Sequence, residues 1–159
     1  MSIQIGDRIP SIVIAQMSEN GPQPVKTGDY FSARKVVLFA VPGAFTPTCS
    51  AYHLPAFVEH FDDFTSKGVD ALACVSVNDV FVMHAWGKSA KAKGIDMLAD
   101  GNGEFSRALG LEMDGSAFGM GNRSQRFALI AEDGIVTQLM VEAPGEFRVS
   151  SAESVLSVL

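Results

Sequence analysis

Cysteine is scarce in this sequence, and its scarcity limits the class of protein. The 159 residues include two cysteines, Cys49 and Cys74, which are too few for the disulfide framework of a small secreted protein. The opening residues, MSIQIGDRIP, lack a basic segment followed by an apolar one, so we expect no secretion signal. The sequence therefore predicts a protein of a reducing compartment, and we expect it in the cytoplasm.

Long apolar runs and excess basic charge are also missing. No run approaches the roughly 20 apolar residues of a membrane-spanning helix. The formal net charge is −6, whereas nucleic-acid binding needs a basic face. We therefore expect neither a membrane nor a nucleic acid as a partner. With 47% hydrophobic and 19% charged residues, and with no repeat or long linker, the chain is expected to form one globular domain over residues 1–159.

Predicted strands and helices alternate along the chain. Continuous apolar runs predict buried strands at 35–40, 70–77 and 95–100. Helices are expected over 47–66, 79–92, 103–110 and the last ten residues. Two runs about the turn EDG predict a hairpin within 126–142, and the segments 18–26 and 115–121 are expected to be loops. This order predicts a thioredoxin-like α/β sandwich, whose central mixed sheet is flanked by helices on both faces.

The stretch VPGAFTPTCS, residues 41–50, places a cysteine at the start of a predicted helix. If Thr46 caps this helix, Pro47 is its first residue, where a missing N–H costs nothing, and Cys49 is its third. A side chain there lies among unpaired backbone N–H groups and at the positive end of the helix dipole. Both features favour the thiolate, which is the nucleophilic form. The position suits a reactive cysteine, although local physics leaves an unreactive one possible.

The residues after Cys49 exclude several classes of reactive cysteine. A thioredoxin-type pair has its second cysteine three residues later, where this chain has Tyr52. A tyrosine-phosphatase-like loop would place an arginine six residues later, where this chain has Pro55. The flanking residues of papain-like and caspase-like enzymes are absent as well.

Four ordered segments resemble one protein family. They are PGAFTPTCS, CSAYHLPAFV, VSVNDVFVMHAWGK and RSQRFALIAEDGIV. The first resembles the peroxiredoxin active-site segment, which reads proline, three residues, threonine or serine, two residues, cysteine; here these are Pro42, Thr46 and Cys49. All four are similar to the type II branch, which includes the plant type II enzymes and the animal fifth peroxiredoxin. The resemblance runs from near residue 3 to the C-terminal helix.

The resemblance implies a thiol peroxidase that reduces hydrogen peroxide and alkyl hydroperoxides. It implies that Cys49 is the peroxidatic cysteine, which becomes a sulfenic acid. Thr46 is then expected to hydrogen-bond the peroxide, and Pro42 to shield the pocket. An arginine of the later strand supports the charges, and this is expected to be Arg126, with Arg123 as either a supporting partner or a surface charge.

Cys74 is a candidate for the resolving residue. Plant type II enzymes carry a second cysteine at this place, and it has been assigned that role there; the buried-strand context of Cys74 instead suggests an inert core cysteine. A disulfide needs Cα atoms within about 7 Å, which a helix start and a neighbouring mid-strand are not expected to meet. We therefore predict that Cys74 is dispensable. Glutaredoxin, glutathione or thioredoxin is the expected reductant.

No metal or cofactor is expected. The histidines at 53, 60 and 84 lack zinc-ligand spacing with either cysteine, and His53 is expected to pack or form hydrogen bonds. The glycines of 115–121 do not match a dinucleotide-binding loop.

Two questions of function stay open. The type II resemblance implies a homodimer, with Phe45, Phe81 and Phe118 as candidates for its interface. The alternative to an enzyme is a peroxide-sensing module on the same fold, which has less need of groups that position a peroxide. A glutathione-transferase-like protein is disfavoured because its expected second domain is missing.

Overall fold

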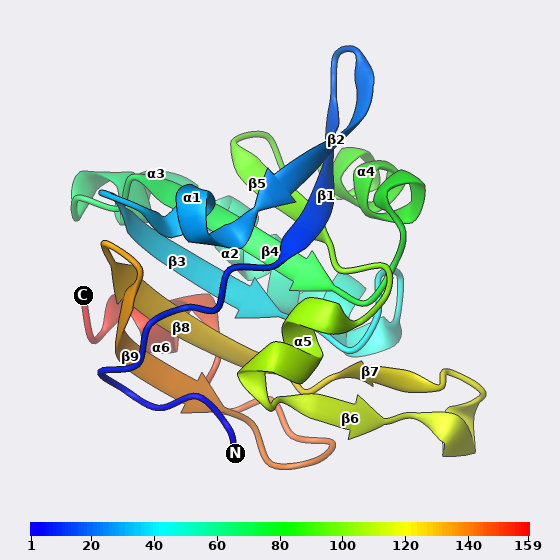
Figure 1. Ribbon diagram of the computed structural model, residues 1–159. Coiled ribbons are helices and arrows are strands. Elements are labelled where there is room, and N and C mark those ends of the chain that lie inside the picture. Colours follow the sequence, from blue (N-terminus) through cyan, green and yellow to red (C-terminus); the bar gives the residue numbers. More distant parts are fainter.

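A seven-stranded mixed sheet forms the centre of the molecule (Figure 1), which the computed structural model describes over residues 1–159. Its strands are β1 (Val13–Ser18), β2 (Gly21–Lys26), β3 (Lys35–Ala40), β4 (Ala71–Ser76), β5 (Ile95–Ala99), β8 (Phe127–Glu132) and β9 (Ile135–Val141). They lie in the order β2-β1-β5-β4-β3-β8-β9. The strands β3, β4 and β5 are parallel, whereas β1, β2, β8 and β9 pair antiparallel with their neighbours.

Helices cover both faces of this sheet, as predicted. On one face lie α2 (Leu54–Glu59), α3 (Phe61–Ser66), α4 (Val80–Ser89) and α6 (Ala152–Leu156). On the other lie α1 (Thr27–Phe31) and α5 (Glu104–Leu109), which Figure 1 shows in front of the sheet. A hydrophobic core lies on each face of the sheet, and alternate residues of β3 pack into the two cores. Val37 and Phe39 pack into one core and Leu38 into the other. No helix is long and apolar enough to cross a membrane.

Several predicted turns and helix ends are confirmed. Asp133 and Gly134, both with positive φ, form the turn between β8 and β9. The Asp79 carboxylate caps α4 by accepting from the Val82 N–H. Gly110, with φ of 71°, ends α5. Ser151 caps α6, where its side chain accepts from the Ser154 N–H.

The expected loop at 18–26 is wrong for most of its length, because residues 21–26 form the edge strand β2. It pairs with β1 in a hairpin that projects from the sheet in Figure 1. Pro22 and Pro24 lie within β2 opposite Met17 and Ala15. An edge strand tolerates proline because the missing N–H would face solvent. The two prolines, and the exposure of most of its residues, give this segment the appearance of a loop in the sequence.

The predicted loop 115–121 is the tip of a second small hairpin. It links β6 (Glu112–Asp114) to β7 (Asn122–Ser124) through a short 3₁₀ turn, η2 (Ser116–Phe118). Figure 1 shows this hairpin projecting away from the main sheet. Strands of three residues carry too little periodicity to be recognised in the sequence.

The predicted helix over 47–66 is interrupted twice. Residues 49–53 form a π-helical turn, η1 (Cys49–His53), in which the Leu54 N–H bonds to the Cys49 carbonyl. Pro55 explains the wide turn, because it has no N–H to donate to the carbonyl four residues earlier. A second break lies at His60, between α2 and α3. Helix α4 also ends earlier than predicted, and Lys91 just beyond it has a φ of 54°.

Candidate functional site

Cys49 is a buried free thiol in the first helical turn after β3. The helix starts as the sequence predicts, with the Ser50 N–H bonded to the Thr46 carbonyl. The prediction that the Thr46 side chain caps this helix is wrong, because its hydroxyl donates to the Gly43 carbonyl at 2.7 Å instead. The backbone N–H of Cys49 has no partner within the chain, so it can donate to a bound molecule.

Arg126, just before β8, brings a positive charge to this thiol. Its Nη2 donates to Cys49 Sγ at 3.0 Å, and its Nη1 donates to His53 Nδ1 at 2.7 Å. The guanidinium also lies over the Phe147 ring, 5.7 Å from the centroid. A guanidinium is charged at all relevant pH values, so the arrangement stabilises negative charge on sulfur.

A cavity of about 430 Å³ lies beside these groups. Its lining includes Pro42, Thr46 and Arg126, three of the four residues that the sequence assigned to the site. The fourth, Cys49, is fully buried and is not part of the lining, but its sulfur contacts Arg126. Met113, Phe118 and Met120 add apolar surface. Three of the four predicted residues therefore line one cavity, and the fourth is in hydrogen-bond contact with one of them, Arg126.

Arg123 lies close to the same loop but has a different task. Its Nε donates to the Met120 carbonyl at 2.8 Å, and it makes no hydrogen bond to Cys49. A Cβ on Gly43 would lie 3.2 Å from Arg123 Nη1 and 3.1 Å from Thr46 Cγ2. A larger residue at 43 would therefore require these neighbouring side chains to shift by a few tenths of an ångström.

Cys74 lies in the middle of β4, paired with Phe39 of β3 and Met97 of β5. It is fully buried and is a free thiol. Burial is the main cause that raises its pKa well above the usual value; nearby Cys49 adds to the rise and Arg126 opposes it. The thiol form is therefore favoured at Cys74, as the buried-strand context predicts.

His53 is buried and forms hydrogen bonds at both ring nitrogens, as expected of it. Nδ1 faces Arg126, and Nε2 lies 2.9 Å from the Ser150 carbonyl oxygen. Burial, and secondly Arg126, lower the pKa of His53 to about 3. The imidazole is therefore neutral near pH 7.

Glu142 is a buried residue of the site region that the sequence reasoning missed. Its carboxylate accepts from the backbone N–H groups of Arg148, Val149 and Ser150 and from the Ser150 hydroxyl, at 2.7–2.9 Å. Burial acts to raise its pKa, but these hydrogen bonds outweigh burial and lower it. An acidic residue ending an apolar strand before a Pro-Gly loop is the only sequence signal, and it does not reveal these partners.

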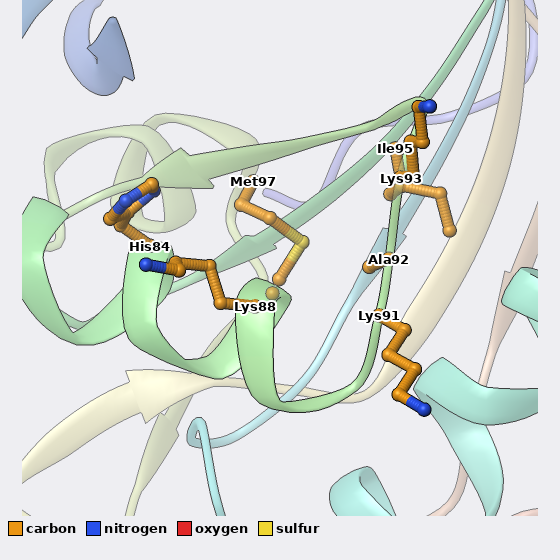
Figure 2. A pocket seen from close by; sticks show the side chains of 8 residues that line it. His84, Lys88, Lys91, Ala92, Lys93, Ile95 and Met97 are labelled. Atoms are coloured by element: carbon orange, nitrogen blue, oxygen red, sulfur yellow. The ribbon is translucent and has the colours of Figure 1, made fainter. Parts of the chain in front are cut away.

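A second cavity, of about 310 Å³, lies between α4 and the start of β5 (Figure 2). Its exposed polar lining consists of His84, Lys88, Lys91 and Lys93. Figure 2 shows Lys91 and Lys93 extending away from His84 and Lys88. Neither cysteine lines this second cavity. No cluster of histidine, cysteine and carboxylate side chains in the molecule is arranged to hold a metal ion.

Comparisons with known proteins point to one family. The Redoxin family matches residues 4–156. Peroxiredoxin-2B of Arabidopsis thaliana is 48% identical over 159 residues, covering 99% of this chain and 98% of the relative. The structure of reduced Prx3 of Vibrio vulnificus in complex with H₂O₂ is 51% identical, with a TM-score of 0.96 and 98% of both chains covered. Peroxiredoxin 5 of Alvinella pompejana is 37% identical, with a TM-score of 0.85, and 98% of this chain and 96% of that one covered.

Proposed function

We propose that Cys49 is the nucleophile of this chain, which belongs to the peroxiredoxin family and is therefore a thiol peroxidase. The thiolate attacks the terminal oxygen of a hydroperoxide, so that an S–O bond forms as the O–O bond breaks. Sulfur is oxidised to sulfenic acid, and the departing oxygen takes a proton and leaves as water or an alcohol. The observation that carries this assignment is the 3.0 Å contact between Arg126 Nη2 and Cys49 Sγ.

The groups around Cys49 suit the placement of a peroxide. Because the Thr46 hydroxyl donates its proton to Gly43, its lone pairs are left to accept from the peroxide O–H. The unpartnered N–H of Cys49 is a donor for the peroxide oxygens. Arg126 supports the charge that moves from sulfur to the departing oxygen. Pro42, in the cavity lining, shields the site from water.

Hydrogen peroxide and alkyl hydroperoxides are the proposed substrates. The related Prx3 of Vibrio vulnificus was crystallised with H₂O₂, which supports the smaller substrate. The apolar lining of the 430 Å³ cavity, at Met113, Phe118 and Met120, suits an alkyl group. Since Cys49 itself is fully buried, a peroxide must displace a neighbouring group slightly, and compact peroxides should react fastest.

An external thiol is proposed to regenerate the enzyme. The first thiol attacks the sulfenic sulfur, releasing water and forming a mixed disulfide, and a second thiol releases Cys49 as a thiolate. Glutaredoxin with glutathione, or thioredoxin, would supply these thiols. Steady-state peroxide consumption with each reductant supplied separately tests this function. Sustained turnover supports the peroxidase, whereas a single oxidation with every reductant would indicate a peroxide sensor.

We further propose that residues 1–159 form one domain that pairs with a second copy in the cytoplasm. Exposed aromatic side chains support a homodimer: Phe45, Phe81 and Phe118 are 52%, 64% and 81% exposed. The two free cysteines suit a reducing compartment. Light scattering after size exclusion is expected to give the mass of a dimer for the wild type and of a monomer for Phe81→Glu.

A further inference from the structure

His53 lies between the Arg126 guanidinium and the backbone carbonyl of Ser150, and each of its ring nitrogens contacts one of them. A carbonyl oxygen can only accept, so the 2.9 Å contact with Ser150 places the ring proton on Nε2. Nδ1 then carries a lone pair and accepts from Arg126 Nη1 at 2.7 Å. The tautomer is thus fixed by the partners of the ring.

Arg126 is held at both of its terminal nitrogens. One donates to Cys49 Sγ and the other to His53, while the guanidinium carbon lies over the Phe147 ring. A free arginine side chain would lose rotamer freedom each time it supported the reacting sulfur. An arginine that is already fixed spends less free energy on ordering during the reaction.

The acceptor for His53 is itself fixed by Glu142. This carboxylate accepts the backbone N–H groups of Arg148, Val149 and Ser150, and also the Ser150 hydroxyl. The Ser150 carbonyl therefore occupies a defined place beside η1. The chain of contacts runs from Glu142 through Ser150, His53 and Arg126 to Cys49.

We propose that His53 is a positioning residue, a neutral acceptor that holds the Arg126 guanidinium against the Cys49 sulfur. This inference rests on the proposed role of Cys49. His53 touches neither sulfur nor peroxide in this role, and acts through Arg126 alone.

The surroundings of the ring keep it neutral. The charged groups that face it are Arg126, from before β8, and Glu142, from after β9. Phe39, Phe57 and Phe147 enclose it, with ring centroids 4.8–5.6 Å away. Burial and Arg126 together lower the pKa of His53. A protonated ring would lose its Nδ1 lone pair and repel the guanidinium, so the acceptor role requires this neutrality.

A double-mutant cycle between His53→Phe and Arg126→Met tests the proposal. The rate of peroxide loss is measured in a single turnover of the reduced protein. His53→Phe keeps an aromatic ring among its aromatic neighbours but removes the acceptor, and should slow the reaction roughly tenfold or more. In the Arg126→Met background the same change should alter the rate by less than about twofold, because the residue through which His53 acts is already gone.

A conservative variant and a control variant test whether the loss of rate comes from the missing hydrogen-bond acceptor. His53→Gln should recover most of the lost rate, since an amide can accept from Arg126 and donate to Ser150. His60→Gln should leave the rate unchanged, because His60 contacts Asp63 and Glu153 on the surface. If His53→Phe does not fold, the cycle is run with His53→Asn, which is too short to bridge both partners, and the same non-additivity is expected.

The outcomes separate this inference from the proposed function. Multiplicative losses in the double mutant, or no rescue by His53→Gln, would mean that His53 has only a structural role. Undiminished peroxide loss by Cys49→Ser in the same assay would instead overturn the proposed nucleophile.

Discussion

The two cysteines differ in their surroundings although both are fully buried. Cys49 lies at a helix start, where a guanidinium nitrogen is 3.0 Å from its sulfur and a cavity lies nearby. Cys74 lies mid-strand between two parallel neighbours, and burial raises its pKa. With Cys49 as the proposed nucleophile, burial alone does not decide the reactivity of a thiol. In this proposal a charged partner at hydrogen-bond distance decides it.

Replacing Cys49 should have the largest effect on peroxide reduction. We expect Cys49→Ser to abolish peroxide reduction, because a serine hydroxyl stays protonated beside Arg126 and is a poor nucleophile. Peroxide consumption with an external thiol donor measures it. Activity within tenfold of wild type would show that Cys74, or another group, carries the reaction.

Changing the charged partner should have the next largest effect. Arg126→Lys keeps the charge but cannot reach both Cys49 and His53 with a planar fork. We expect the second-order rate with hydrogen peroxide to fall about 100-fold. Arg123→Lys is the matched control and should stay within about threefold, since Arg123 bonds to the Met120 carbonyl. The reverse pattern would mean that the wrong arginine is assigned.

The pH dependence of stability should depend on the buried imidazole of His53. The pKa of His53 is about 3 in the folded protein against 6.5 when unfolded, so between these values the unfolded state binds the extra proton. Stability from this group is complete above pH 6.5 and is lost as the pH falls, by up to about 1.4 kcal/mol per pH unit.

Denaturant titrations of wild type and His53→Gln between pH 6.5 and 4.5 measure this slope. The variant should show a flatter dependence, since glutamine does not titrate there. His60, whose hydrogen bond to Asp63 raises its pKa, contributes with the opposite sign and cancels because both proteins contain it. Equal slopes would contradict a neutral, buried His53.

Replacing the second cysteine should have the smallest effect. We expect Cys74→Ser to retain most of the glutaredoxin-supported turnover, because in the proposed cycle an external thiol, and not Cys74, resolves the sulfenic acid. The substitution places a hydroxyl in a buried strand, so stability should fall by about 1–3 kcal/mol; Cys74→Ala therefore serves as a second test of turnover. Loss of turnover in both variants would identify Cys74 as the resolving residue.

Much of the architecture could be predicted because local and global signals agree. The run KVVLFA is buried on both faces of the sheet, and Gly110 and Asp79 mark helix ends as expected. Prolines in β2 concealed a strand, since their cost depends on whether the strand lies at an edge. The π-helical turn depends on Pro55 acting within a helix whose other residues fit the α pattern.

The site was predictable only in part. Pro42, Thr46, Cys49 and Arg126 were identified through a motif and a family resemblance, and the fold brings them together. The links from Glu142 to Ser150 and from Ser150 to His53 span 8 and 97 residues. Such contacts follow from the packing of distant segments, and no local pattern in the sequence encodes them.

Mass spectrometry after one equivalent of hydrogen peroxide tests most directly whether the charged partner selects the reactive cysteine. The reduced protein is oxidised in the presence of a sulfenic-acid trap, unfolded, and treated with a thiol-alkylating reagent. The account predicts the trap on Cys49 and an alkylated, unoxidised thiol on Cys74. A trapped sulfenic acid on Cys74, or a disulfide between Cys49 and Cys74, would contradict it.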